Sequence, residues 1–322
     1  MEMKPLGGLH HVTAITGDAP ANLAFYTRTL GMRLVKKTVN QDDVSAYHLF
    51  YADAKGSPGT DLTFFDWPHT PANQPGAGSI APVALRIAGN ASLEWWLARL
   101  DEKGVGHDEI AERNGRAYLS FTDPEGQRLE LVADGGAPGG APWAASPVPA
   151  EHQVKGLHGV TLTSFRPEST VDVLVGAMGF RSSGEGELPG GGVEHFFEVG
   201  PGGPGAEVIV SAPARVEPAR QGRGGVHHVA FRVPDDETHA AWREHIAGVG
   251  LRPTPVIDRF YFRSIYFREP GGALFEIATD GPGFAADEPE EHLGEHLALP
   301  PFLEPDREQI EAGLVPLGLP VP

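Results

Sequence analysis

Two histidine pairs have the residue type and the repetition expected of metal ligands. His10-His11 lies in the sequence GLHHVT and His227-His228 lies in GVHHVA, while an acidic candidate, Glu276, follows in GALFEIA. The chain has no cysteine, which excludes thiolate chemistry, so a metal ion would have to bind to His, Asp or Glu. Two imidazoles and one carboxylate form the ligand set of non-haem Fe(II) oxygenases, which leaves other coordination positions open.

The alternation of side chains along a strand sorts these residues by face. Successive side chains of a strand point to opposite sides of the sheet. His227 is in phase with Val229 and therefore faces an apolar layer, whereas His228 faces the other way, and the same argument separates His10 from His11. One concave surface is therefore expected to carry four polar side chains: His11, His228, Glu276 and Tyr266.

Hydrophobic periodicity and turn residues predict an α+β protein. A strand over 9–16 is followed by a helix over 19–30, and an amphipathic helix over 92–103 ends at Gly104. Similar βαβββ units recur, which gives four modules in two tandem pairs. Shifts in composition set four segments: an N-terminal pair of modules (1–134) that supplies His11, a Pro/Gly-rich linker (135–155), a C-terminal pair (156–284) that supplies His228 and Glu276, and an acidic, proline-rich tail (285–322).

The internal repeat shows which modules keep the candidate ligands. Superposing the repeats places Gly159 at the position of the first-module histidine and Pro82 at that of the fourth-module histidine, although Glu130 keeps the carboxylate of Glu276. The middle modules therefore lack both imidazoles. In the first module, Thr63 stands where the fourth module has its glutamate, so no further carboxylate ligand is evident. We expect the two outer modules to pair and form the site.

Composition excludes several other classes of function. The 322-residue chain carries a formal charge of −18, which opposes contact with nucleic acid. No apolar run approaches the about 18 residues of a membrane span, and the N-terminal residues do not resemble a signal peptide, so no membrane partner is expected and the expected location is the cytoplasm. The substrate should be small, and the sequence permits a homo-oligomer.

The motifs resemble the vicinal oxygen chelate superfamily, which includes glyoxalases, bleomycin-resistance proteins and extradiol dioxygenases. The resemblance covers residues 6 to about 285 and implies mixed sheets that curve into cup-like barrels, with helices outside. Within the superfamily, the chain is most similar to the hydroquinone ring-cleaving dioxygenases. The matching segments are Leu9-His-His-Val-Thr13, Leu93-Glu-Trp-Trp96, Val226-His-His-Val-Ala-Phe231, Arg259-Phe-Tyr-Phe-Arg-Ser-Ile-Tyr266 and Pro270-Gly-Gly-Ala-Leu-Phe-Glu276.

The resemblance implies a set of roles for these residues. Fe(II) is the expected metal, although Mn(II) or Zn(II) can occupy such a site in an isolated protein. The expected ligands are His11, His228 and Glu276. The expected catalytic and supporting residues are Arg259 and Tyr266 beside the substrate oxygens, and His10, Thr13 and His227 next to the ligands. The predicted reaction is extradiol-type opening of a hydroquinone or related phenol with O2.

Two other functions fit the same scaffold. A glyoxalase-type lyase or isomerase would use Zn or Ni and would normally need a second carboxylate at the metal, where this chain has Thr63. A non-catalytic small-molecule binding protein needs no ligands, so the complete set argues against it. A separate motif, His292-Leu-Gly-Glu-His296, matches a short zinc-peptidase pattern, but Gly294 interrupts the helix that this pattern requires.

Overall fold

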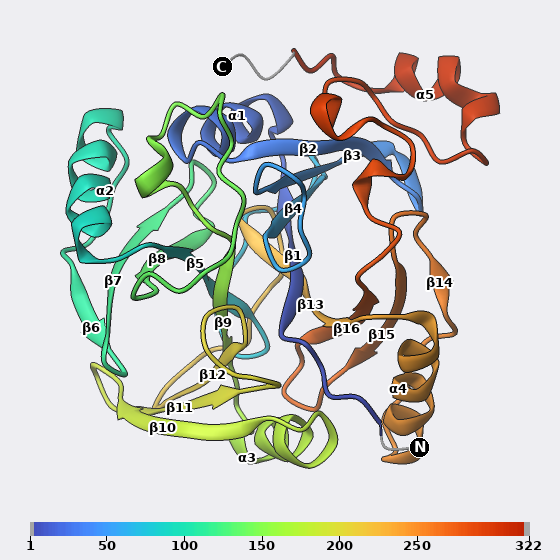
Figure 1. Ribbon diagram of the computed structural model, residues 1–322. Helices are drawn as coiled ribbons and strands as arrows, with labels where there is room; N and C mark the ends of the chain where they lie inside the picture. Colours follow the sequence, from blue (N-terminus) through green and yellow to red (C-terminus); the bar gives the residue numbers. More distant parts are fainter. Residues whose placement is uncertain (1–2, 319–322) are drawn as a thin grey trace.

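A computed structural model describes residues 3–318 and contains two eight-stranded mixed sheets (Figure 1). One sheet combines the first and fourth modules, and the other combines the second and third. The expected α+β class, with curved mixed sheets and helices outside, is confirmed. The strand orders are β14-β15-β16-β13-β1-β4-β3-β2 and β10-β11-β12-β9-β5-β8-β7-β6.

The first module contains a short crossover helix, which we expected from the sequence to be longer. Asp18 caps this helix by accepting a hydrogen bond from the Ala21 backbone N–H (3.0 Å), and Pro20 lies in the first turn, where its missing N–H is not needed. The helix predicted over 19–30 ends early and continues as a π-helical turn. The elements are β1 (Leu9–Thr16), α1 (Ala19–Ala24), the π turn (Phe25–Thr29), β2 (Arg33–Asn40), β3 (Asp43–Ala52) and β4 (Asp61–Asp66).

The second module contains the amphipathic helix predicted over 92–103. Gly104 ends this helix in the left-handed conformation (φ 68°), which glycine adopts without steric cost. Leu93, Trp96 and Leu100 are fully buried, which confirms the predicted apolar face. The elements are β5 (Ile80–Ile87), α2 (Asn90–Lys103), β6 (Ala111–Arg113), β7 (Arg116–Thr122) and β8 (Arg128–Ala133).

The third and fourth modules repeat this order of elements. The third consists of β9 (Leu157–Thr163), α3 (Pro167–Val171), a π turn (Asp172–Ala177), β10 (Arg181–Glu187), β11 (Gly192–Glu198) and β12 (Glu207–Pro213). The fourth consists of β13 (Gly225–Val233), α4 (Asp236–Gly248), β14 (Ile257–Asp258), β15 (Arg263–Arg268) and β16 (Leu274–Thr279). Among the described residues, no helix has both the length and the apolar character needed to cross a bilayer.

The outer modules are joined by the antiparallel pair β1 and β13. Thr13 lies opposite His228 in this pair, and β16 runs parallel to β13 with Glu276 beside Ala230. On the other side of β16, Tyr266 of β15 lies opposite Glu276. The pairing that the repeat predicted for the outer modules is thus confirmed, and it brings the candidate ligands onto three neighbouring strands.

The two faces of this first sheet have different environments. Val229 and Phe275 belong to the main hydrophobic core, and helix α4 packs against β16. Ala230, one residue away, belongs instead to a separate apolar cluster with Phe262 on the opposite face. The alternation inferred from the sequence holds for His11, His228 and Glu276, which lie on the face opposite the covered apolar one. It is wrong for His10 and His227: each lies at a register shift between β1 and β13 and contacts the neighbouring ligand through Nδ1.

The segment after β16 lies against the first module. Its backbone forms a bridge between Leu297 and Lys37 of β2, and the red trace crosses the blue strands in Figure 1. Short 3-10 turns (Phe284–Ala286, Glu290–His292, Glu304–Asp306) precede helix α5 (Arg307–Gly313). The predicted tail, 285–322, includes residues 319–322, which lie outside the described residues. The division of the sequence at 135–155 stays a prediction.

Candidate metal centre

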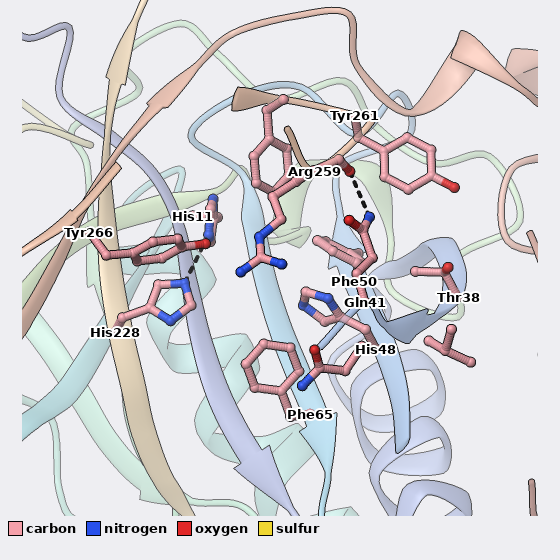
Figure 2. Close-up of a pocket in the computed structure, with 13 residues that line it drawn as sticks. His11, Thr38, Gln41, His48, Phe50, Phe65, His228, Arg259, Tyr261 and Tyr266 are labelled. Carbon is pink, nitrogen blue, oxygen red and sulfur yellow. Dashed lines mark hydrogen bonds between the residues drawn. The ribbon is translucent and has the colours of Figure 1, made fainter. Parts of the chain in front are cut away.

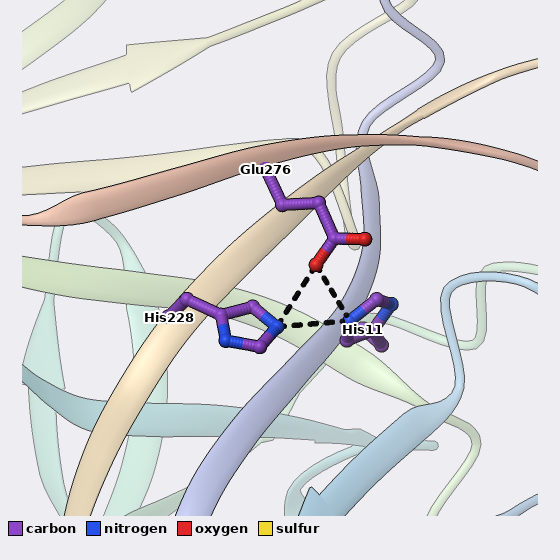
Figure 3. A group of neighbouring side chains, drawn as sticks. All are labelled: His11, His228 and Glu276. Carbon is purple, nitrogen blue, oxygen red and sulfur yellow. Dashed lines mark hydrogen bonds and ion pairs between the residues drawn. The ribbon is translucent and has the colours of Figure 1, made fainter. Parts of the chain in front are cut away.

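Three side chains from three strands converge on one point (Figure 3). The Nε2 atoms of His11 and His228 lie 3.2 Å apart, and the Oε2 atom of Glu276 lies 3.2 Å from the first and 2.9 Å from the second. All three side chains are buried. The structure therefore brings together the three residues that the sequence suggested as ligands.

A hydrogen-bond chain through His10 fixes the protonation of His11. The Nε2 atom of His10 lies 3.1 Å from the carbonyl oxygen of Thr279, which can only accept, so this nitrogen carries the proton. The Nδ1 atom of His10 then accepts from Nδ1 of His11 at 2.9 Å. His11 is left with a lone pair on Nε2, the form that binds a metal ion.

The second histidine pair has the same contact between Nδ1 atoms. The Nδ1 atoms of His227 and His228 lie 2.8 Å apart, so a proton on Nδ1 of His228 leaves its Nε2 atom free as a ligand. Burial lowers the pKa of both His10 and His227 to about 3, so both imidazoles stay neutral at ordinary pH. His10 thus orients His11, and His227 orients His228.

The charge of Glu276 also fits a bound cation. Burial alone would raise the pKa of this carboxyl, but His11 and His228 hold it well below its usual range when their Nε2 atoms carry protons, so the carboxyl stays ionised. Ser264 donates to the Oε1 atom, whereas Oε2 has no hydrogen-bond partner within residues 3–318. A buried carboxylate oxygen that faces two imidazole lone pairs is a repulsive arrangement, which a divalent cation would turn into an attractive one.

A cavity opens beside the two histidine ligands (Figure 2). It spans about 430 Å³, including space that is open to solvent, and aromatic rings form several of its walls. Tyr266 lies beside His228, with ring centroids 5.5 Å apart, and the guanidinium of Arg259 lies 5.7 Å from the Tyr266 ring. The lining residues are His11, Thr38, Val39, Asn40, Gln41, His48, Phe50, Phe65, His228, Arg259, Tyr261, Phe262 and Tyr266.

The first module holds Arg259 in place. Gln41 donates through Nε2 to the Arg259 backbone carbonyl oxygen at 2.8 Å, and Asp42 forms an ion pair with the guanidinium at 2.8 Å. Although burial acts the other way, bonds to Asp42 and Tyr266 raise the pKa of Arg259. Burial and the charge of Glu276 raise the pKa of Tyr266, so its hydroxyl keeps its proton. Both side chains face the cavity, as the sequence analysis expected.

Thr13 occupies a different place from the other predicted residues. Its hydroxyl accepts from Thr63 at 2.8 Å, and Thr63 lies 3.0 Å from Nε2 of His48. Thr63 is thus close to the site but offers a hydroxyl where the fourth module has its carboxylate. Sequence reasoning missed His48, although alternation along β3 places it on the same face as Phe50, which also lines the cavity.

The second sheet explains why the middle modules do not repeat the site. Glu130, the counterpart of Glu276, is buried and forms a paired contact with the guanidinium of Arg113. A cation supplied by the protein therefore neutralises this carboxylate. At Gly159, the counterpart of His11, a Cβ atom would lie 2.9 Å from the Glu207 carbonyl oxygen, so even the first atom of a larger side chain would clash.

The short peptidase-like motif has no helix to organise it. His292 ends a 3-10 turn, and its Nδ1 atom contacts the exposed carboxylate of Glu295 at 3.1 Å. Gly294 has a φ of 77°, which is incompatible with a continuous right-handed helix. The interpretation of this segment as a structural part of the tail agrees with its conformation.

Comparisons with known proteins identify the family. The glyoxalase/bleomycin resistance protein/dioxygenase superfamily matches residues 8–131 and 156–277. The Bacillus subtilis protein named "Putative ring-cleaving dioxygenase MhqA" is 44% identical over 97% of this chain and 99% of its own length. The chlorohydroquinone/hydroquinone 1,2-dioxygenase of Sphingobium indicum is 34% identical, over 94% of this chain and 94% of its own length.

Solved structures agree with this assignment. A "putative dioxygenase" from Bacillus subtilis superposes with a TM-score of 0.87 and 39% identity, over 98% of each chain. Glyoxalase I from Zea mays superposes with a TM-score of 0.62 and 14% identity, over 90% of this chain and 96% of that one, which is a likeness of fold alone. The chain therefore belongs to the glyoxalase/bleomycin resistance protein/dioxygenase superfamily.

Proposed function

We propose that this protein is an Fe(II)-dependent, extradiol-type ring-cleaving dioxygenase that opens a hydroquinone or a related phenol with O2. The observation that carries the proposal is the convergence of His11, His228 and Glu276 at the head of a cavity. The substrate class is supported by the named activity of the Sphingobium relative. The donor set supports Fe(II), because two imidazoles and one carboxylate are typical of non-haem iron oxygenases.

The protein would hold the metal ion with the three convergent atoms described above. Bound Fe(II) would lower the pKa of a coordinated phenol hydroxyl and bring the phenol and O2 next to each other. His10 and His227 would keep the two imidazole ligands in the tautomer that binds metal, because their own Nδ1 atoms act as acceptors.

Arg259 and Tyr266 would act on the substrate oxygen. The guanidinium carries a permanent positive charge at the cavity wall, where it can stabilise a phenolate. The Tyr266 hydroxyl, which stays protonated, can donate a hydrogen bond to the same oxygen. Aromatic side chains such as Phe65 and Phe262 limit the access of water and provide an apolar surface for the ring.

Oxygen consumption tests the proposal directly. Protein loaded anaerobically with Fe(II) should consume O2 when hydroquinone or methylhydroquinone is added and should release a ring-opened unsaturated acid. Catechol should be a poorer substrate, and the H228A variant should consume no O2 above background. A protein that retains iron but consumes no O2 with any phenol would contradict the assignment. Turnover of the glutathione–methylglyoxal adduct with Zn or Ni would support a glyoxalase-type isomerase instead.

A further inference from the structure

We propose that His48 accepts a hydrogen bond from the second hydroxyl of a para-diphenol and thereby sets a preference for hydroquinones over phenols that lack this group. The inference deepens the proposed function and rests on it. His48 lies outside the sequence motifs that contain the metal ligands His11, His228 and Glu276. It comes from β3 of the first module and lines the same cavity as His11 and His228.

His48 lies across the cavity from the ligands. In Figure 2 the guanidinium of Arg259 lies between the imidazoles of His11 and His228 on one side and that of His48 on the other. Two aromatic rings hold the His48 imidazole, with centroid separations of 3.9 Å to Phe50 and 4.4 Å to Phe65. The orientation of His48 is therefore set by packing before any ligand binds.

The hydrogen-bond network assigns the tautomer of His48. Thr63 donates its hydroxyl proton to Thr13, so the oxygen of Thr63 is left to accept a proton from Nε2 of His48 at 3.0 Å. Burial, with the nearby positive charge of Arg259, lowers the pKa of His48 well below its usual range, so the ring is neutral. With the proton on Nε2, the Nδ1 atom carries a lone pair and is an acceptor.

The Nδ1 atom is available to a ligand. Within residues 3–318 it has no hydrogen-bond partner, while the imidazole forms part of the cavity wall. A phenol whose first hydroxyl lies at His11 and His228 would direct a para substituent away from the ligands, toward the side of the cavity where His48 lies. An ortho hydroxyl would instead stay beside the first one, near Tyr266. An acceptor at the position of His48 therefore matches a para-diphenol.

Among the other polar residues that line the cavity, Thr38 provides a matched comparison. Thr38 is buried and lines the same cavity, and its Oγ1 atom has no hydrogen-bond partner among the described residues. The hydroxyl of Thr38 could serve the same substrate group. The T38V variant removes that hydroxyl with little change in shape, so it separates the contribution of Thr38 from that of His48.

Anaerobic binding measures the preference without turnover. Fe(II)-loaded protein is titrated by calorimetry with hydroquinone and with 4-fluorophenol, which has a similar shape but cannot donate from its para position. The wild-type protein should bind hydroquinone up to about tenfold more tightly, as expected for one added hydrogen bond. The H48F variant should bind the two phenols equally, and T38V should keep the wild-type ratio.

The variants distinguish this inference from the proposed function. An unchanged ratio in folded H48F, or a ratio lost in T38V, would overturn the role of His48 while leaving the dioxygenase assignment intact. If neither phenol binds to the iron-loaded wild-type protein, both proposals fail. If H48F does not fold, T63V tests the same contact, because it frees His48 from the assigned tautomer. A reduced ratio in T63V supports the proposal, and an unchanged ratio contradicts it.

Discussion

The Nε2 atom of His11 lies 3.2 Å from the Nε2 atom of His228, although the two residues are 217 positions apart in the chain. The antiparallel pairing of β1 with β13 creates this proximity, and β16 adds Glu276 from the next strand. The first and last modules must therefore fold onto each other before the site exists. Metal binding should stabilise this pairing, because a metal ion that binds only the folded state shifts the folding equilibrium.

Replacing Glu276 by Gln should weaken metal binding by at least about 100-fold, because the substitution removes the only carboxylate among the three convergent side chains. The affinity is measured by titration against a competing chelator, and the bound metal by elemental analysis after dialysis. E130Q is the matched control, since Glu130 is the counterpart of Glu276 but pairs with Arg113. Equal metal loss in folded E276Q and E130Q would contradict the assigned ligand.

Replacing His10 by Phe should lower metal affinity by about 10- to 100-fold without removing a ligand. The substitution removes the acceptor that keeps the proton of His11 on Nδ1, while the aromatic packing beside Phe262 is retained. The same chelator titration measures the effect. H158F serves as the control, because His158 is the counterpart of His10 but lies on β9 of the other sheet. Unchanged affinity in H10F would show that His10 does not orient the ligand.

The candidate ligands could be predicted from sequence because strand periodicity and an internal repeat are local signals. Alternation selected His11 and His228 from their pairs, and the repeat showed that Gly159 could not replace a ligand. The hydrogen bonds that position the ligands, in contrast, join residues that no local pattern connects. The Thr279 carbonyl oxygen contacts His10 from 269 positions away, and Ser264 donates to Glu276 from the neighbouring strand. No residue pattern reports such contacts, because they depend on how the strands pair and how the modules pack.

Composition indicated only an acidic, proline-rich tail and could not specify which residues the tail contacts. In the structure, Asp287 and Glu288 contact the ammonium group of Lys36, which has an exposed fraction of 0%. Asp287 also accepts from Tyr261, a residue of the cavity wall, at 2.8 Å. The number of acidic residues gives the charge of the tail. The effect of these residues on stability depends instead on whether the cation that they contact, here Lys36, is buried.

The K36M substitution should therefore destabilise the protein by about 3 kcal/mol, because it leaves two partly buried carboxylates without their cation. Chemical unfolding monitored by tryptophan fluorescence gives the free energy of unfolding. K55M is the control, since Lys55 contacts Glu290 at 3.6 Å with both side chains exposed, and should cost less than about 1 kcal/mol. Similar decreases in the free energy of unfolding for K36M and K55M would mean that the buried ion pairs of Lys36 stabilise the protein no more than an exposed one.

Replacing Asp66 by Asn should stabilise the protein at pH 8 but not at pH 4. Burial, together with the charges of Glu125 and Asp18, raises the pKa of Asp66 to about 6, and its Oδ1 atom has no hydrogen-bond partner within residues 3–318. Because the folded-state pKa lies above the unfolded value of about 3.9, the folded state binds the proton more tightly. This contribution to stability is complete below pH 4 and is lost as the pH rises through 6.

The neutral amide of D66N avoids that loss. After allowance for the partial exposure of the carboxyl group, the gain at pH 8 should be about 1 kcal/mol. Urea unfolding of the metal-free protein at pH 4, 6 and 8 measures it, since bound metal would add its own dependence on pH. E112Q, which changes an exposed carboxylate on β6, should show little difference between these pH values. If D66N were less stable than the wild type at pH 8, the buried charge of Asp66 would not be a source of instability, and its contacts would have to outweigh the cost of burial.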